Sequence, residues 1–416
     1  MIKLKQYIFH KQAINFVNYY IFTIINAVIS VLSISYLTKH IPVEDYGRIG
    51  IFSSIFFFTP SLVTFCANGL QAIEIVDLNE EGYLKFRNEY ITFVLLNSLF
   101  FVALACLISL IVPDFGFVII SATVMGLIQA FVNVHNTELF QNSQAARFGL
   151  ISTATVLSSF LLTFLFISIF NLDWKFRIIA LILAEFLVLI FRFYFFSSIG
   201  KKFSFHINKL QFKFFMHYGS PLILTTLAGW AINQSDRFFL LHYFSLKEVG
   251  IYAAAGSIVS FIAMINGNMI KVIYPLVFKK LSKREGRKFI LMLTLIYLIL
   301  ILLITAVFCL VIYFFGHLIL GAKYQDAYPI IYIMCFGQAF FGIYGTTGIV
   351  IDYFKRTKLK TVLILTASIL IVVFSFILIN ILGDYGPAIA SVISFVFLAV
   401  ASFVIVKRLF NTYEIV

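Results

Sequence analysis

Residues 289–315 read FILMLTLIYLILILLITAVFCLVIYFF, a stretch of 27 residues without one charged side chain. A helix that crosses the hydrocarbon core of a bilayer needs about 20 such residues, so this stretch predicts a transmembrane helix. The rest of the chain has the same character. Of its 416 residues, 62% are hydrophobic and 12% are charged, whereas a soluble domain carries about 25% charged residues. The roughly 258 hydrophobic residues are enough for about twelve spans and little else.

This composition excludes a soluble enzyme, a secreted disulfide-bonded domain and a disordered chain, each of which needs more polar residues. It also leaves no long polar stretch for a catalytic domain outside the membrane. The four cysteines, at positions 66, 106, 309 and 335, lie in apolar stretches without a CxxC pair, so we expect free thiols packed among helices. The first apolar stretch reaches about Leu37 and lacks a small-residue cleavage site, so we expect a retained first span.

Polar breaks divide the chain into twelve predicted spans with short segments between them. Lys and Arg accumulate on the cytoplasmic side of membrane proteins, and here they alternate from segment to segment. With the N-terminus inside, 22 of the 31 bases fall inside, six fall outside, and Arg192, Arg237 and Lys271 lie within or at the edges of spans. This pattern predicts that both termini are cytoplasmic. The predicted spans are residues 12–37, 48–75, 90–112, 116–139, 148–170, 177–198, 214–242, 249–276, 289–315, 326–350, 361–382 and 386–406.

The net charge of +13 does not indicate nucleic-acid binding. The bases are spread over the inside segments, where they face anionic lipid headgroups, and no basic patch with interleaved aromatic residues stands alone. The chain contains no GxxxxGK[ST], HExxH or GxSxG motif and no cluster of His and Cys. We therefore expect no nucleic-acid partner, no metal site, no cofactor, no catalytic residues and no enzymatic activity.

Two loops in the first half of the chain have counterparts in the second half. Gly47, in the run VEDYGRI, aligns with Gly250, in the run LKEVGIY, at an offset of 203 residues. Glu81-Gly82 aligns with Glu285-Gly286 at an offset of 204. An offset that stays nearly constant over a whole span favours an internal repeat. Chance similarity between common loop residues is the alternative.

These patterns predict an all-α polytopic membrane protein, with twelve transmembrane helices in two six-helix bundles. The N-terminal lobe would comprise residues 1–200 and the C-terminal lobe residues 201–416. Because six is an even number, both bundles enter the membrane from the same side, and a pseudo-two-fold axis along the membrane normal relates them. Transporters built in this way bind substrate between the halves and alternate access by rocking one half against the other.

Polar side chains form stripes on equivalent spans of the two halves, the first and second and the seventh and eighth. Polar residues are costly in lipid, so we expect the stripes to line a polar cavity where these spans meet. Interhelical hydrogen bonding without a ligand is the alternative. At about 100° per residue, each stripe covers about a third of the circumference of its helix. The stripe of the first span is Asn15, Asn18, Asn26, Ser30 and Ser33, and that of the second is Ser61, Thr64, Asn68 and Gln71. The stripe of the seventh span is Thr226, Trp230, Asn233 and Arg237, with Asp236 at the edge, and that of the eighth is Ser257, Ser260, Met264, Asn268 and Lys271.

Two bases on these stripes point to an anion-binding cavity. Arg237 and Lys271 are the bases most clearly within spans, and Arg48 opens the second span. A buried cation needs a counter-charge or water. Arg offers a planar fork that matches a phosphate group, and Lys offers a point charge. A structural ion pair of Arg237 with Asp236 or Glu248 is the alternative.

Four carboxylates also fall within predicted spans. Glu185 lies seven residues from Arg192 on one helix face, which favours a structural ion pair. Glu74, Glu138 and Asp236 are the others, and a carboxylate in this setting can carry a proton. Their spacing singles out none of them.

Three stretches carry a resemblance to a known family: LTKHIPVEDYGRIG at 37–50, YGSPLILTTLAGWAINQSDRFFLLHYFSLKEVGIYAAAGSI at 218–258 and NILGDYGPAIASVISF at 380–395. With them the chain resembles the bacterial polysaccharide-biosynthesis flippases, the Wzx-type translocases of O-antigen or related repeat units. These belong to the multidrug/oligosaccharidyl-lipid/polysaccharide exporter superfamily. The run Ser235-Asp236-Arg237 is the most specific match, whereas Pro387 stands where the family has Gly or Ala.

The resemblance implies a V-shaped transporter in the bacterial inner membrane, with a cationic central cavity. It would move undecaprenyl-diphosphate-linked oligosaccharides from the cytoplasmic to the periplasmic leaflet, with glycan polymerase and chain-length proteins as further partners beside the lipid bilayer. On this interpretation three bases bind the diphosphate, four side chains bind sugars, and one of two acids couples an ion gradient. The three bases are Arg237, Lys271 and Arg48. The four sugar-binding side chains are Asn233, Trp230, Asn268 and Asn68. The coupling acid is Asp236 or Glu74.

Two other functions stay open from the sequence. A cation antiporter of the related multidrug-exporter type would need carboxylates on the first and seventh spans. The first span has none, and the seventh has Asp236 beside Arg237. A membrane-bound scaffold or polymerase partner in glycan assembly is the third reading.

Overall fold

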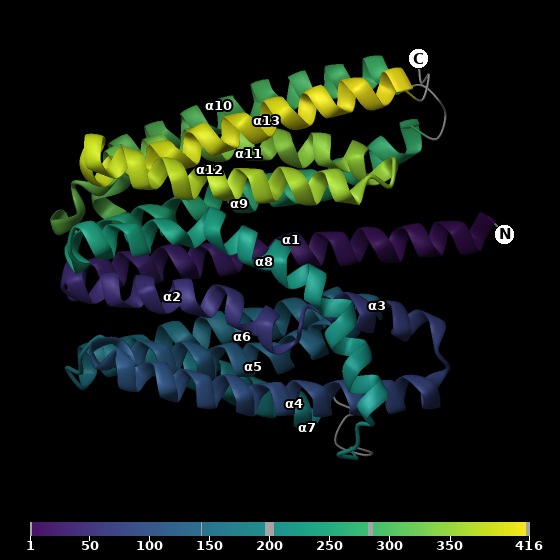
Figure 1. Ribbon diagram of the computed structural model, residues 1–416, viewed down its shortest axis with the longest axis horizontal. Helices are drawn as coiled ribbons and strands as arrows, with labels where there is room; N and C mark the ends of the chain where they lie inside the picture. The colour runs from purple at the N-terminus through teal and green to yellow at the C-terminus, as the bar shows by residue number, and fades with distance from the viewer. Residues whose placement is uncertain (1, 143, 196–203, 282–285, 413–416) are drawn as a thin grey trace. The chain divides into compact units, whose positions relative to one another are not determined.

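The computed structural model describes residues 2–142, 144–195, 204–281 and 286–412, and within these ranges it consists of helices without a β-strand (Figure 1). Short 3-10 or π segments, among them η2 (Leu165–Ile169) and η5 (Gly383–Tyr385), connect or extend some of the helices. The α-helices are α1 (Ile2–His40), α2 (Val43–Val63), α3 (Asn68–Asp77), α4 (Glu80–Ile111), α5 (Gly116–Gln141), α6 (Ala145–Phe164), α7 (Lys175–Phe195), α8 (Lys209–Tyr243), α9 (Leu246–Leu281), α10 (Arg287–Ile319), α11 (Ala327–Tyr353), α12 (Thr357–Leu382) and α13 (Gly386–Thr412).

Apart from the second, each predicted span has most of its residues on one of these α-helices, although 148–170 runs on into η2 and 177–198 is described only as far as residue 195. The second predicted span falls on the broken pair α2 and α3. If that pair counts once, the described chain has twelve long helical segments in the predicted order. By length and apolarity, eight stretches of the described residues can cross a membrane, or nine with the α2–α3 pair, and one of the eight contains both α12 and α13. The all-α membrane architecture is confirmed, and the number of crossings stays a prediction.

The chain folds into two compact units. Unit 1 comprises Met1–Ser33 and Ile51–Thr226, and unit 2 comprises Ile34–Gly50 and Leu227–Val416. Consequently α1, α2 and α8 each contribute one part to each unit. The expected lobe boundary at residue 200 falls in 196–203, outside the described residues, and the division into two six-helix lobes stays a prediction.

The start of α8 belongs to unit 1 because its aromatic side chains pack into the core of that unit. Phe215 is fully buried. Its ring centroid lies 5.0 Å from that of Phe93, 5.4 Å from that of Tyr90 and 5.6 Å from that of Phe86, all on α4. Tilted and edge-to-face pairs of this kind stabilise beyond their contact area.

The second predicted span is broken between α2 and α3, and the helix axes differ by 40°. Pro60 lies one turn before the break and weakens the helix there. Phe65 and Cys66 then adopt left-handed backbone angles, with φ of 51° and 55°. Gly219 of α8 packs directly on the carbonyl of Phe65, so a side chain at position 219 would collide with the break.

In unit 2, α2 and α9 cross at two glycines. A Cβ on Gly47 would overlap the carbonyl oxygen of Leu246, and a Cβ on Gly250 would overlap the carbonyl oxygen of Val43. Val43 and Leu246 differ by the same 203 residues as the two glycines. The crossing is therefore symmetric under the predicted repeat, and small residues allow the helix backbones to meet.

Arg87, counted among the bases of the inside segments, is not in a loop. The helix α4 begins at Glu80, ten residues before the predicted span, because the Asn79 side chain accepts the Gly82 amide at 2.9 Å and caps it. Arg87 thus lies within the helix with 1% of its surface exposed. Several other residues of the sequence argument lie outside the described part: Lys201, Lys202, Lys283, Arg284, Glu285 and the side chain of Asn15.

Candidate functional site

The residues expected to bind substrate fall in both units. Unit 1 contains two of them, on α3, and unit 2 contains the other seven, on α2, α8 and α9. Those of unit 1 are Asn68 and Glu74; those of unit 2 are Arg48, Trp230, Asn233, Asp236, Arg237, Asn268 and Lys271.

Arg237 lies where three elements of unit 2 meet. Its guanidinium donates to the side-chain oxygen of Gln234 on α8 and, at 3.4 Å, to the carbonyl of Gly50 on α2. On α9, Gly256 leaves room for it, since a Cβ there would lie 3.5 Å from Nη2. The side chain is half-buried. Two neutral oxygens thus contact this cation, and two glycines lie beside it.

The two carboxylates expected as alternative partners of Arg237 have contacts of their own. The Asp236 carboxylate is buried and accepts the backbone amide of Arg237 at 3.0 Å. Glu248, at the start of α9, accepts the amide and the hydroxyl of Ser245 at 3.1 and 2.6 Å. Glu248 therefore acts as part of the helix start, where a negative charge is favourable.

The remaining residues of unit 2 lie along α2, α8 and α9. The ring of Trp230 packs against Phe238, with centroids 5.6 Å apart. Asn233 is exposed and donates to the Gly229 carbonyl at 2.7 Å. On α9, Lys271 is exposed and lies one turn after the half-buried Asn268. Arg48 forms an ion pair with Asp45 one turn earlier on α2.

In unit 1 the polar stripes bond neighbouring helices. Asn26 donates to the Ser152 hydroxyl at 3.0 Å, and Asn68 accepts the Tyr90 hydroxyl at 2.8 Å. Glu74 is half-buried near the end of α3. These contacts are the ones that interhelical packing predicts, and a role of Asn68 with sugars or of Glu74 with ions stays a prediction.

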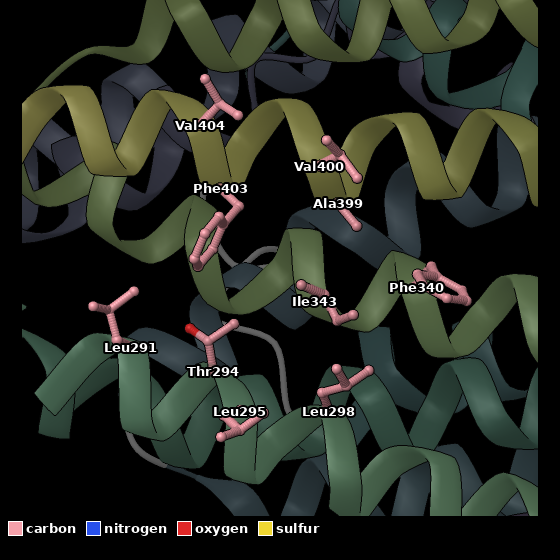
Figure 2. Close-up of a pocket in the computed structure, with 10 residues that line it drawn as sticks. All are labelled: Leu291, Thr294, Leu295, Leu298, Phe340, Ile343, Ala399, Val400, Phe403 and Val404. Atoms are coloured by element: carbon pink, nitrogen blue, oxygen red, sulfur yellow. The ribbon is translucent and has the colours of Figure 1, made fainter. Parts of the chain in front are cut away.

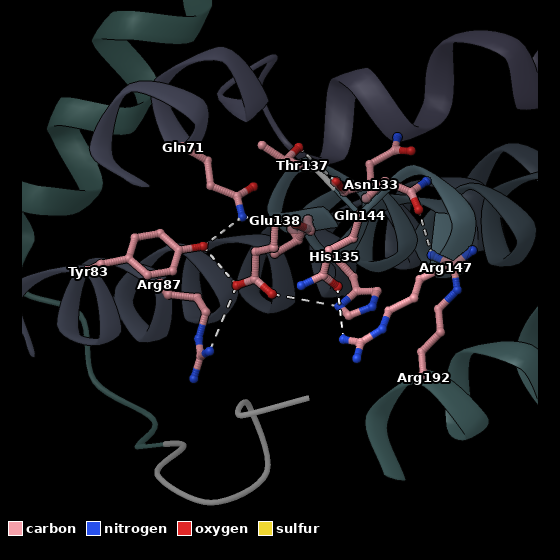
Figure 3. Close-up of polar contacts among 12 residues, drawn as sticks. Gln71, Tyr83, Arg87, Asn133, His135, Thr137, Glu138, Gln144, Arg147 and Arg192 are labelled. Carbon is pink, nitrogen blue, oxygen red and sulfur yellow. Dashed lines mark hydrogen bonds and ion pairs between the residues drawn. The ribbon is translucent and has the colours of Figure 1, made fainter. Parts of the chain in front are cut away.

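A buried polar cluster in unit 1 was not predicted as a site (Figure 3). At its centre, the Glu138 carboxylate accepts the Tyr83 hydroxyl at 2.8 Å and faces Arg87 at 3.8 Å and His135 at 3.7 Å. The amide of Gln71 donates to the Tyr83 hydroxyl at 3.1 Å and to the carbonyl of residue 134 at 2.9 Å. The cluster thereby joins α3, α4 and α5.

The sequence pointed to only part of this cluster. Glu138 was one of the carboxylates that can carry a proton, but its partners were not identified. Two spacings could have found them: His135 precedes Glu138 by one helical turn, and Tyr83 precedes Arg87 by one turn on the next helix. The predicted pair of Glu185 with Arg192 lies nearby on α7, and both residues are buried.

Pockets also lie elsewhere among the described residues. A polar pocket of about 360 Å³ in unit 1 is lined by Glu81, Leu84, Lys85, Asn88, Glu89, Ser204 and His206. An apolar groove of about 450 Å³ in unit 2 runs between α10, α11 and α13 (Figure 2). Thr294 is its one polar residue, so it suits hydrocarbon and cannot solvate a charged headgroup. The other groove residues are Leu291, Leu295, Leu298, Phe340, Ile343, Ala399, Val400, Phe403 and Val404.

Among the described residues, no group of three or more His, Cys, Asp or Glu side chains is placed to hold a metal ion.

The fold is that of known transporters. An inward-facing multidrug resistance MATE family transporter of the MOP superfamily matches with a TM-score of 0.73 and 15% identity, over 94% of this chain and 95% of that one. The lipid II flippase MurJ, in an inward closed conformation, matches with a TM-score of 0.71 and 17% identity, over 94% of this chain and 87% of that one. These matches confirm the predicted all-α membrane-protein fold class.

Two curated relatives come from Haemophilus influenzae. "Lsg locus putative protein 1" is 21% identical over 269 residues, which cover 61% of this chain and 63% of that protein. An uncharacterized membrane protein is 26% identical over 160 residues, which cover 38% of this chain and 39% of that protein. The chain thus spans less than two thirds of the length of these relatives.

Residues 14–281 match the polysaccharide biosynthesis protein family. This range covers more than half of the chain. The protein belongs to this family, as the resemblance of its sequence implied, and is a multi-pass membrane protein.

Proposed function

We propose that this member of the polysaccharide biosynthesis family is a flippase for undecaprenyl-diphosphate-linked oligosaccharides. It would carry them from the cytoplasmic to the periplasmic leaflet of the bacterial inner membrane by alternating access. The family match over residues 14–281 carries this proposal. The fold shared with the lipid II flippase MurJ supports it, because it shows that such a scaffold can serve a lipid-linked substrate.

The diphosphate would bind to the bases of unit 2. Arg237 is already held in place by Gln234 and Gly50, so little side-chain freedom is lost when its guanidinium binds an anion. Lys271 on α9 and Arg48 on α2 would add charge without a fixed geometry. A phosphate group taken from water into a membrane protein needs such cations, because its desolvation is costly.

The sugars would bind to amides and an aromatic face. Asn233 and Asn268 offer both donors and acceptors to hydroxyl groups, and Asn68 does the same from unit 1. Trp230 offers a ring face to the apolar side of a sugar. The polyprenyl tail would stay in lipid, because neither a charged nor a polar group is needed to hold it.

Transport would draw on an ion gradient through a carboxylate that gains and loses a proton or cation. Asp236 is suited to this because it is buried beside Arg237, so its charge state alters the field at the proposed anion site. Glu74 on α3 is the second candidate. Glycan polymerase and chain-length proteins would receive the product.

A cation antiporter is the second candidate function, favoured by the TM-score of 0.73 to a multidrug resistance transporter. Such a protein needs acidic side chains facing its substrate. In the described stretch of α8 that carries the predicted site, Asp236 is directly followed by Arg237, which counteracts binding of a cation. Uptake of a cationic dye by vesicles containing the purified protein, with no transfer of lipid-linked glycan, would favour this function.

Depletion of the protein in its host tests the proposal. We expect an undecaprenyl-diphosphate-linked oligosaccharide to accumulate in the cytoplasmic leaflet, while surface glycan falls about tenfold or more. Mass spectrometry of the extracted lipid identifies the sugars. Restored surface glycan on re-expression is the control, and unchanged lipid-linked pools after depletion would reject the flippase.

A further inference from the structure

The cluster around Glu138 contains a buried histidine, His135, whose ring forms no hydrogen bond within the described residues. His135 has 5% of its surface exposed, and within the described residues neither ring nitrogen has a hydrogen-bond partner. A buried polar group in that state costs free energy. Its Nδ1 lies 3.7 Å from the Glu138 carboxylate, slightly beyond hydrogen-bond distance. A small movement of either side chain would allow a charged pair to form.

Histidine is the side chain that ordinarily changes charge between pH 5 and 8. With His135 neutral, the central charges are those of Arg87 and Glu138, which offset each other. With His135 protonated, one carboxylate faces two cations, at 3.8 and 3.7 Å. The two cations, Arg87 and His135, repel each other. Arg87 is only 1% exposed and the Glu138 side chain 14%, so water screens the repulsion between the two cations poorly. Protonation therefore favours an arrangement in which the helices separate and admit water.

The elements packed against α5 supply further charged or titratable groups around the cluster. From α4 come Tyr83 and Arg87, from α6 Arg147 and from α7 Arg192 (Figure 3), which donates to the Asn136 side chain at 2.7 Å. The α3 side chain in the cluster is the neutral Gln71. Glu185 opposes Arg192 on α7, and the other acids of the packed elements are the buried Glu89 on α4 and the half-buried Glu74 on α3.

We propose that His135 and Glu138 form a proton-binding site that controls the attachment of α3 and the start of α4 to α5. A proton from solvent binds to a ring nitrogen of His135, and the ring turns to the Glu138 carboxylate. The hydrogen bond that this carboxylate accepts from the Tyr83 hydroxyl then weakens. Gln71 then loses its link to Tyr83, and the end of unit 1 where these helices meet opens. Return to neutral pH releases the proton and restores the contacts.

Amide hydrogen exchange of the full-length protein in lipid nanodiscs tests this, after correction for the intrinsic pH dependence of exchange. Between pH 7.5 and 5.5 we expect protection of 68–77 and 80–88 to fall about tenfold, which corresponds to a coupling of about 1.4 kcal/mol between proton binding and opening. Peptides from α12, in unit 2, should not respond. A wild-type protein without a pH-dependent change at these segments overturns the proposal.

Five variants separate the proton site from ordinary structural contacts. His135→Gln should keep protection at both pH values, with His135→Asn in its place if the first does not fold. Glu138→Gln should lose protection at both pH values, because it removes the carboxylate that faces Arg87. Tyr83→Phe should lower protection at pH 7.5 but keep a pH-dependent change. His206→Gln, a control at an exposed histidine of unit 1, should behave as wild type.

A pH response that survives in His135→Gln and His135→Asn, or that disappears in His206→Gln, would contradict the proposal. No substrate is needed for these measurements. Failure of the proton site would therefore leave the flippase function standing, and a protein that transports nothing could still respond to pH.

Discussion

Replacing Gly250 with alanine strongly destabilises the protein, whereas the same replacement at Gly267 on the same helix does not. A Cβ at position 250 would overlap the backbone carbonyl oxygen of Val43, and the carbonyl carbon of Val43 would lie only 2.9 Å from this Cβ. Backbone cannot turn aside as a side chain can, so α2 and α9 must move apart, at a cost of about 3 kcal/mol or more. At Gly267 nothing lies within 4 Å, and alanine there gains helix propensity of about 1 kcal/mol.

The measurement is the melting temperature and monodisperse yield of the purified variants in detergent. Because the crossing is symmetric, Gly47→Ala should resemble Gly250→Ala, since its Cβ would overlap the carbonyl of Leu246. Equal stability of the 250 and 267 variants would contradict the close helix crossing. Loss of stability in one glycine variant of the crossing but not the other would contradict its symmetry.

The double variant Arg237→Ala, Lys271→Ala inserts into the membrane but accumulates lipid-linked precursor in the cytoplasmic leaflet. Each charge-assisted hydrogen bond to a phosphate is worth about 1.5–3 kcal/mol, so two losses reduce binding about a hundredfold or more. The measurement is surface glycan together with the inward-facing precursor in cells. Normal surface glycan in the double variant would reject the anion site.

A matched control removes two bases that lie outside the proposed site. Lys247 and Lys323 are exposed, and Lys247→Ala, Lys323→Ala removes the same charge from the chain. Arg237 also contacts Gln234 and Gly50, so a purely structural role must be distinguished. Arg237→Lys keeps the charge but not the fork; it should retain more transport than Arg237→Ala at equal melting temperature.

The sequence predicts the helices well because long apolar stretches bounded by polar segments leave few alternatives in a bilayer. The break between α2 and α3 was not predicted. Pro60 is visible in the sequence, but the helix turns only at Phe65 and Cys66, where Gly219 of α8 packs on the backbone. That contact joins residues more than 150 positions apart, and neither periodicity nor composition reports it.

The polar cluster of unit 1 was not predicted from the sequence for a related reason. A base near a span end, such as Arg87, is counted with the loop when the span is taken to begin at residue 90. The Asn79 cap moves the helix start to Glu80, and only the packing of α4 on α5 then brings Glu138 to Arg87 and Tyr83. Polar residues within spans are visible in sequence, but their partners depend on which helices are neighbours.

The most direct test of the central claim is translocation by the purified chain in vesicles. Undecaprenyl-diphosphate-linked oligosaccharide is placed in the vesicles, and its exposure on each leaflet is followed with a membrane-impermeant lectin. We expect transfer between leaflets well above that of protein-free vesicles, and a return to the protein-free rate for the Arg237→Ala, Lys271→Ala variant. Transfer by the wild-type chain no faster than in protein-free vesicles, under every ion gradient applied, would contradict the account.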